Sequence, residues 1–298
     1  MILENQLLTS SVCPTAETKR LFRETACRLE PFGCVSARAC NFESDRYYIV
    51  LDTGTGDFFG NMASLLVALY EQEMEHDHFG LDTQAMVSKF WGLALIYYDY
   101  GFTTNNEALV FPHFKYAKLN PKAQPYARLL SSAAQQFFLY HEFGHVVDGF
   151  SDSPLGTEDA EYSADMFAFT AVRETAFSIN DTNIITWTIL GCVLALLAIE
   201  FVESTFPGLT IVRGGTETIF PGPSASYPTA RSRFHRLLDC FPEKQRRMLE
   251  TNPVFKLMRK VCSGYSQQIR EGARPSKAHW DLMESVLESH QRRKADRG

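Results

Sequence analysis

The chain has 298 residues, of which 45% are hydrophobic, and a formal net charge of -6. This composition supplies a large apolar core and excludes an intrinsically disordered protein. The negative charge excludes the broad basic surface that nucleic-acid binding needs, so we expect no nucleic-acid partner. The seven cysteines contain no CxxC pair, and the N-terminal residues lack a basic leader followed by an apolar run, so we expect a cytoplasmic protein.

The first sixty residues predict a small α+β unit. An amphipathic pattern predicts a helix over Ala16–Glu30. Short alternating runs at Cys34–Cys40 and Arg46–Leu51 then predict a β-hairpin. The run DTGTGD, Asp52–Asp57, supplies turn residues, so we expect a turn before the next helix.

Two helices and a long loop are predicted next. Apolar periodicity indicates helices over Phe58–Glu75 and Gln84–Tyr98. The segment Thr103–Pro125 contains Asn, Pro and Lys with little periodicity. We therefore predict a loop bordering a substrate cleft, with one short strand at Ala108–Phe111.

The central part of the chain predicts three helices. Apolar residues at helical spacing indicate Tyr126–Val147, and a polar loop over Ser151–Thr157 leads into Glu158–Phe177. The segment Ile184–Val202 is almost wholly apolar and approaches the length that spans a bilayer. Polar residues interrupt and flank it, and no Lys or Arg cluster marks a cytoplasmic end, so we predict a buried core helix and no membrane contact.

The rest of the chain predicts an irregular segment followed by helices. Pro207–Pro228 is rich in Gly and Pro, which predicts an ordered loop or β-turns near the cleft. Further helices are predicted over Thr229–Cys240, Pro253–Arg270 and Ser276–Arg293. Without an internal repeat or an evident linker, we predict one domain over residues 1–298. Its fold class is α+β and predominantly helical, with an α+β part at 1–125 and a helical part at 126–298.

The run HEFGH, residues 141–145, has the spacing of a metal site. On a helix His141 and His145 project from one face, so both imidazoles can bind one ion, and neutral imidazole suits zinc. Glu142 lies about 100° around the helix from His141, where its carboxylate reaches a water molecule at the metal rather than the metal itself. We therefore predict two zinc ligands and, in Glu142, the general base.

The following predicted helix supplies a third ligand. Glu161 opens the run EYSAD sixteen residues after His145, which leaves room for a turn and an antiparallel return. Asp165 lies one helical turn later on the same face, and we predict that it accepts a hydrogen bond from a ligand histidine. Other carboxylates within reach of the same turn remain alternative ligands: Asp148, Glu158 and Asp159.

With both motifs in place, the chain resembles the gluzincins, metallopeptidases that carry HExxH on one helix and a ligand Glu on the next. More narrowly, it resembles the Lit-like phage-exclusion peptidases in the stretches HEFGHVV, EYSAD, Val193–Glu203 and YPTARSRFHRLLDCFP. The resemblance implies a zincin-like core that holds one Zn²⁺ ion. Where that family has His before Pro, this chain has Tyr227, and Arg233 retains the family's later Arg. The resemblance implies that Tyr227 or Arg233 stabilises the oxyanion formed during hydrolysis.

The motifs and the resemblance together predict a zinc-dependent endopeptidase that acts on a protein or peptide. The resemblance implies proteolysis of a host cytosolic protein, such as a translation factor, as an antiviral response in phage exclusion. Three alternatives stay open: a regulatory metallopeptidase that cleaves a partner repressor, a zinc-containing binding or effector module without catalysis, and a membrane peptidase, which depends on the segment Ile184–Val202. Because an always-active cytosolic protease is dangerous, we also expect gating, for example by an activator.

Overall fold

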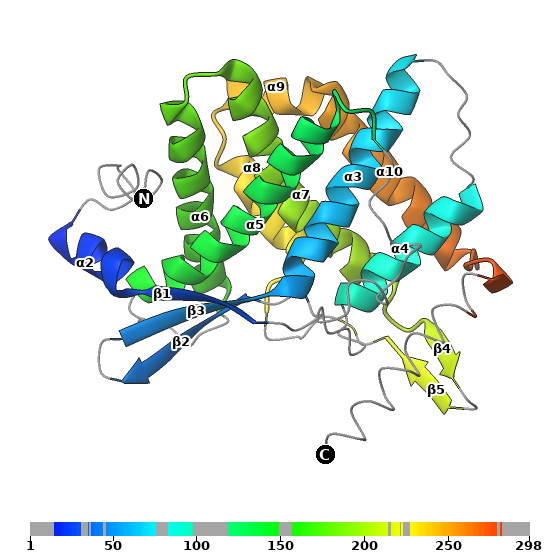
Figure 1. Ribbon diagram of the computed structural model, residues 1–298, viewed down its shortest axis with the longest axis horizontal. Coiled ribbons are helices and arrows are strands. Elements are labelled where there is room, and N and C mark those ends of the chain that lie inside the picture. Colours follow the sequence, from blue (N-terminus) through cyan, green and yellow to red (C-terminus); the bar gives the residue numbers. More distant parts are fainter. Residues whose placement is uncertain are drawn as a thin grey trace.

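A computed structural model describes residues 15–30, 35, 37–43, 46–75, 83–97, 119–148, 157–213, 216–220, 222, 227–278 and 281. These residues are mostly helical, with one three-stranded and one two-stranded sheet (Figure 1). The arrangement confirms the predicted α+β class with a predominance of helix.

The chain changes from helix to strand earlier than predicted. Helix α2 (Ala16–Glu24) is followed at once by strand β1 (Ala26–Glu30). The helix predicted over residues 16–30 is therefore wrong in its last third. Thr25 takes an extended conformation, and β1 pairs in parallel with the strand over residues 46–52, so tertiary pairing overrides the local helical pattern.

The remaining strands of this sheet form the predicted hairpin. β2 (Ala37–Glu43) pairs antiparallel with β3 (Arg46–Asp52), with Ala39 opposite Ile49. The strand order is β1-β3-β2, which places β2 at an edge of the sheet. This edge lies against helix α5 (Gln124–Val147), which carries the HEFGH motif.

Strand β3 passes directly into α3 (Thr53–Glu75). The turn predicted at Asp52–Asp57 is therefore wrong, because most of that run forms the first turns of α3. Thr55 and Phe58 are fully buried, and their packing outweighs the low helix propensity of the two glycines in the run. Helix α4 (Thr83–Tyr97) follows, close to its predicted position.

The loop predicted over Thr103–Pro125 can be compared only at its end. Residues 98–118, including the strand predicted at Ala108–Phe111, lie outside the described residues. Helix α5 begins at Gln124, so the last two residues of the predicted loop belong to its first turn. A proline in the first helical turn loses no helical hydrogen bond, which explains why the helix tolerates it there.

The central helices occur where they are predicted. After α5 come α6 (Glu158–Ser178) and α7 (Thr182–Thr205). Thr157 begins α6 as its N-cap, with its hydroxyl oxygen accepting the backbone N–H of Ala160. The polar loop predicted before it lies outside the described residues except for Thr157.

Helix α7 is a core helix, as predicted. Most of its apolar side chains are buried, and those of Val193, Leu194 and Leu196 are fully buried. In the described part of the chain it is the single helix whose length and composition would suit a membrane span, yet 67% of its most apolar stretch is buried inside the protein. A Cβ atom on Gly191 would lie 2.5 Å from Cβ of Ala133, so α5 and α7 cross in close contact.

The segment predicted as an irregular loop over Pro207–Pro228 contains a short hairpin of β4 (Thr210–Arg213) and β5 (Thr216–Ile219). Three helices then follow: α8 (Ala230–Asp239), α9 (Glu243–Thr251) and α10 (Pro253–Arg270). Helix α9 was not predicted, since only Asn252 separates it from α10. The helix predicted over Ser276–Arg293 lies almost wholly outside the described residues.

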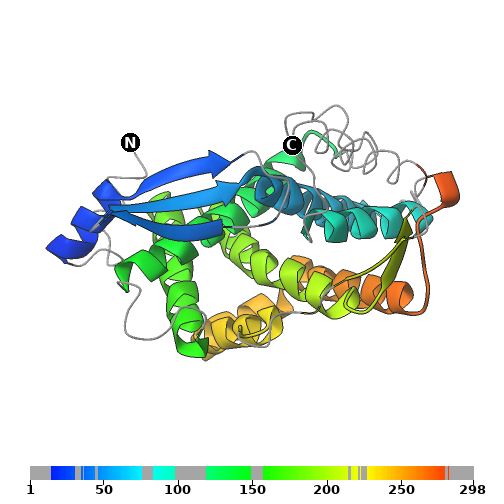
Figure 2. The ribbon, with the colours of Figure 1, turned by 90° about the horizontal axis from the view of Figure 1, so that it is seen from below.

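The elements form layers around α5 and α7. Figure 2 shows the three-stranded sheet with α3 and α4 on one side of these helices and α8 and α10 on the other. Helix α5 packs on α3, α6, α7 and β2, while α7 packs on α5, α6, α8 and α10. Both helices are therefore held on several sides, and residues on α5 keep fixed positions relative to α6 and α8.

Candidate metal centre

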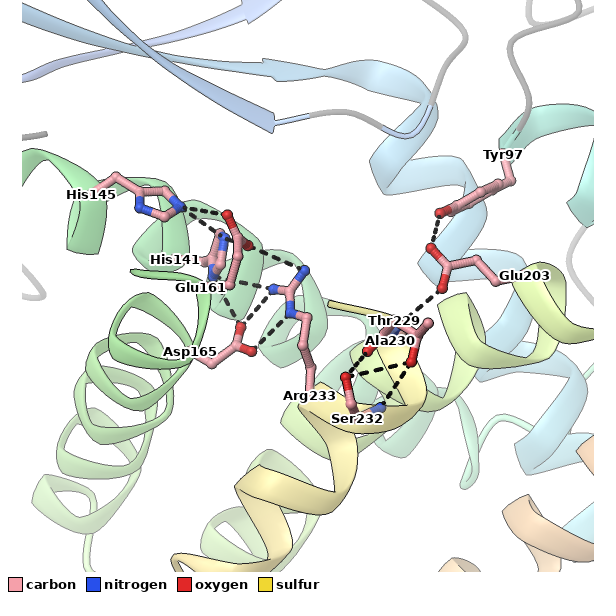
Figure 3. A network of polar contacts seen from close by, with 10 residues as sticks. All are labelled: Tyr97, His141, His145, Glu161, Asp165, Glu203, Thr229, Ala230, Ser232 and Arg233. Atoms are coloured by element: carbon pink, nitrogen blue, oxygen red, sulfur yellow. Dashed lines mark hydrogen bonds and ion pairs between the residues drawn. The ribbon is translucent and has the colours of Figure 1, made fainter. Parts of the chain in front are cut away.

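Helix α5 presents His141 and His145 on one face, and α6 presents Glu161 toward them (Figure 3). The two histidine Nε2 atoms are 3.2 Å apart. Nε2 of His141 lies 3.2 Å from Oε2 of Glu161, and Nε2 of His145 lies 3.5 Å from Oε1 of Glu161. All three residues are buried, and within the described ranges they form the one group of His, Cys, Asp and Glu side chains that could hold a metal ion.

The spacing of these three side chains fits a tetrahedral ion. Nitrogen and oxygen ligands lie about 2.0–2.1 Å from zinc, so any two of them in a tetrahedral site are about 3.3 Å apart. The observed separations of 3.2, 3.2 and 3.5 Å match that edge length. Three protein ligands also leave a fourth position open, as in catalytic sites rather than closed structural ones.

A close approach of α5 and α6 brings Glu161 to the histidines. A Cβ atom on Gly144 would lie 2.9 Å from Cα and 3.2 Å from Cβ of Ala164. Side chains essentially never approach a backbone atom this closely, so the crossing requires glycine on α5. The glycine inside HEFGH therefore serves packing, a role that its position in the motif did not indicate.

Asp165 lies in contact with His141. Its Oδ1 lies 2.9 Å from Nδ1 of His141 and both side chains are buried. An N–H at Nδ1 that donates to this carboxylate leaves the lone pair of Nε2 directed toward Glu161 and His145. Asp165 therefore selects the tautomer in which Nε2 can bind a metal.

Arg233 of α8 contacts the carboxylates of both Asp165 and Glu161. Its Nε and Nη2 donate to the two oxygens of Asp165 at 2.8 and 2.6 Å, and its Nη1 lies 3.5 Å from Oε2 of Glu161. Nη2 also lies 3.3 Å from Nδ1 of His141. The Nδ1 atom is closer to Oδ1 of Asp165, at 2.9 Å. This paired geometry orients Asp165 and neutralises buried negative charge.

The start of α8 is tied to α7 and α4, which places Arg233. Glu203 of α7 accepts the backbone N–H of Ala230 at 3.1 Å and the hydroxyl of Tyr97 at 3.0 Å (Figure 3). The hydroxyl of Thr229 accepts the backbone N–H of Ser232 as the N-cap of α8. No sequence pattern marks Glu203 as part of this network, because its partners lie 106 and 27 residues away.

The charges of this network shift its pKa values. Burial and the Arg233 charge lower the pKa of His141, but hydrogen bonds with Asp165 and Glu161 outweigh them and raise it to about 9. Burial lowers the pKa of His145 below its ordinary value. Burial raises the pKa of Asp165, but the charge and hydrogen bonds of Arg233 outweigh this and lower it to about 2. Burial also raises the pKa of Glu161, but its hydrogen bond with His141 and the neighbouring positive charges lower it overall. Without a metal ion, His141 is therefore cationic at neutral pH, and a binding metal would displace that proton.

Glu142 takes a position that the motif could not specify. Its Oε2 accepts the backbone N–H of Ala39, on edge strand β2, at 2.8 Å. The bond joins residues 103 positions apart and holds the carboxylate against the edge strand, from where its charge acts to raise the pKa of His145. No pattern in the hairpin sequence marks Ala39 as part of the site, since any residue with a backbone N–H can supply this donor.

Tyr227 lies at the border of the site. Its side chain is half-exposed, and burial raises the pKa of its hydroxyl, with further contributions from the charges of Glu161 and Glu142. Tyr227 is thus close enough to sense both carboxylates. Across the described residues its hydroxyl has no hydrogen-bond partner, so it is available to a bound molecule.

The alternative carboxylates do not join the metal group. Glu158 is exposed and accepts the hydroxyl of Tyr162 at 2.6 Å. Asp148 and Asp159 are also exposed. Within the described chain, Glu161 is the carboxylate of this turn that meets the histidines.

The site as a whole consists of a buried group that can bind a metal ion, the side chains of Asp165 and Arg233 in contact with that group, and Glu142, which follows His141 on α5. These side chains come from α5 and α6, which follow one another in the chain, and from α8, which begins more than fifty residues after α6 ends. No family model, curated protein or solved structure matches this chain. The interpretation of its function therefore depends on the residues and geometry of the metal centre.

Proposed function

We propose that this chain is a zinc-dependent endopeptidase. The observation that carries the proposal is the convergence of His141, His145 and Glu161, with separations that fit three edges of a zinc tetrahedron. Two neutral imidazoles and one carboxylate, with a fourth position left open, are a ligand set that catalytic zinc sites use. The same set supports a zincin-like arrangement of α5 and α6.

Glu142 is the proposed general base. A bound zinc ion supplies acidification of water and polarisation of the scissile carbonyl. Glu142 accepts the proton as the water attacks and then passes it to the leaving amine. The hydrogen bond from Ala39 holds the carboxylate in position for both transfers. Because a purely structural zinc site needs no such base, this arrangement supports an enzyme over a binding module.

Two further residues receive different roles. Tyr227 has a raised pKa and a free hydroxyl within the described structure, so it remains protonated and can donate a hydrogen bond to the developing oxyanion. Arg233 is committed to Asp165 through two hydrogen bonds. We assign Arg233 to holding the ligand carboxylates rather than to direct contact with the oxyanion.

The proposed substrate class comes from the resemblance to Lit-like peptidases. It is a host protein of the cytoplasm, such as a translation factor, cleaved during phage exclusion. Cleavage of a partner repressor would use the same residues. Mapping the cleaved protein separates these two cases, because one cut lies in the translation machinery and the other in a transcriptional regulator.

The test combines metal analysis with mapping of new protein N-termini. Purified wild type, His141→Ala and Glu142→Gln are analysed for bound zinc and incubated with bacterial lysate. We expect one zinc in wild type and in Glu142→Gln, less in His141→Ala, and new termini with wild type alone. His235→Ala and Glu158→Gln are matched controls, because both residues are exposed and neither belongs to the metal group.

Specific outcomes would refute parts of the proposal. A wild-type protein that cannot bind zinc would refute the metal centre. Zinc binding with identical termini for wild type and Glu142→Gln, also after lysate from phage-infected cells is added as a source of activator, would refute the peptidase and favour the binding module.

A further inference from the structure

A second hollow lies on the opposite face of α8 from the metal centre. A cavity of about 590 Å³ opens over α7, between α8 and α10 (Figure 2 shows these three helices together). Arg231, Phe234 and His235 of α8 line it, at the helical spacing of one face. Arg233 leaves α8 in another direction and contacts the metal centre, so the two sites are separate.

The groove arises from the way the helices pack. Helices α8 and α10 both pack on α7, and their closest described ring contact joins Phe234 to Phe255 with centroids 6.4 Å apart. Beyond this contact the two helices leave α7 open to solvent, where Glu200 and Ser204 form the floor. The cavity volume falls within the range of small-molecule sites, about 300–1,000 Å³.

Cationic side chains outnumber acidic ones in this groove. It is lined by Arg231, Arg259 and Arg270 against Glu200 and Glu271. Arg231 is 3.9 Å from Glu200 and its side chain is largely exposed, which makes a weak pair. Throughout the described residues, the side chains of Arg259 and Arg270 have neither a hydrogen bond nor an ion pair. In a chain with a net charge of -6, this local excess of positive charge is unusual.

The two carboxylates of the groove are poor partners for these arginines. Glu271 already accepts a hydrogen bond from the amide of Gln267 at 2.8 Å. Burial raises the pKa of Glu200, and the charges of Arg231, His235 and Arg259 offset this only in part. Two guanidinium groups therefore remain available to an incoming anion.

We propose that this groove binds a small molecule bearing phosphate or carboxylate groups. Arg259 and Arg270 pair with its negative groups, because guanidinium forms bidentate hydrogen bonds to both kinds of anion. Ser263 and Gln267, which also line the groove, supply further polar contacts. The proposal does not require zinc or peptidase activity, so it stands or falls independently of the proposed function.

The test measures binding directly by isothermal titration calorimetry on the full chain as purified. Glycerol 3-phosphate and glutarate are the two probes, one a phosphate monoester and the other a dicarboxylate. Both are titrated at an ionic strength of about 0.15 M, where weak surface attraction is screened. Arg259→Gln with Arg270→Gln is compared with Lys244→Gln with Lys256→Gln, which removes the same charge from exposed positions outside the groove.

We expect at least one probe to bind wild type with a Kd below about 1 mM. The arginine double variant should bind that probe about tenfold more weakly, while the lysine double variant should stay within about twofold of wild type. The preferred probe then identifies the anionic group. Absence of binding by both probes up to about 10 mM would overturn the proposal, as would equal losses in the two double variants, which would indicate nonspecific charge attraction.

Discussion

Helix α5 crosses two other helices closely, and in both cases a glycine permits the approach. At one crossing, Gly144 of α5 meets Ala164 of α6, where an added Cβ would lie 2.9 Å from a backbone atom. At the other, Gly191 of α7 meets α5, where an added Cβ would lie 2.5 Å from Cβ of Ala133 and 2.7 Å from the carbonyl oxygen of Leu130. The first crossing lies among buried charged groups, and the second lies in the apolar core.

The difference separates positioning from stability. The crossing at Gly191 brings together apolar side chains, so its loss lowers the stability of the fold without changing the metal group. The crossing at Gly144 brings Glu161 of α6 to the histidines, so its loss also changes the distances within the metal group. Substitutions in the two regions should therefore differ in the ratio of their effects on zinc affinity and on unfolding.

The largest effect on stability should come from Arg233→Met at the charged crossing. The substitution leaves Asp165 and Glu161 buried without their cation, and breaking a buried pair costs about 3–5 kcal/mol. Chemical denaturation of the zinc-free protein measures the loss. Arg247→Met is the control, because its pair with Glu243 is exposed and should contribute little. Equal midpoints for the two variants would contradict the role of Arg233.

Gly191→Ala should give the next largest loss of stability, with zinc affinity preserved. Overpacking of this kind costs about 1–3 kcal/mol, partly offset by the better helix propensity of alanine. Thermal unfolding and a zinc titration of the folded protein are the measurements. Gly264→Ala in α10 is the matched control and should be stabilising, because an added Cβ there meets no atom within 4 Å.

Asp165→Asn should weaken zinc binding, beyond the stability that is lost with its pair to Arg233. Asparagine can still accept the N–H of His141, but the charge that raises the basicity of this ligand is lost, so zinc affinity should fall about 10–100-fold. Competition with a chromogenic chelator measures the affinity. Asp159→Asn, an exposed carboxylate on the same helix, should leave it unchanged. An unchanged affinity in Asp165→Asn would mean that this carboxylate does not orient a ligand.

Gly144→Ala should weaken zinc binding less than Asp165→Asn does, and with a distinct signature. The added methyl group pushes α6 away from α5, which lengthens the separation between Glu161 and His141 and should weaken zinc binding about tenfold. The ratio of this loss to the loss of stability should exceed that of Gly191→Ala. If both glycine variants lowered stability alone, the two crossings would be equivalent and the distinction between them would fail.

Much of the architecture follows from local patterns. The helices that carry the metal residues were predicted to within a few residues, because apolar periodicity over twenty or more residues is a strong signal. The strand β1 and the start of α3 were predicted wrongly, since both depend on partners elsewhere in the chain. Short segments with competing propensities are decided by the pairing and burial available to them.

The sequence by itself determined the central residues of the site. The spacing of His141 and His145 places both on one face of any helix, and the run EYSAD places Glu161 and Asp165 one turn apart. Only the tertiary structure decided the distance between these two pairs, the hydrogen bond that Ala39 donates to Glu142, and the contact of Arg233 with Asp165 across 68 residues. Helical periodicity fixes contacts within a turn, whereas contacts between helices depend on how closely their surfaces can approach, and here one glycine sets that distance.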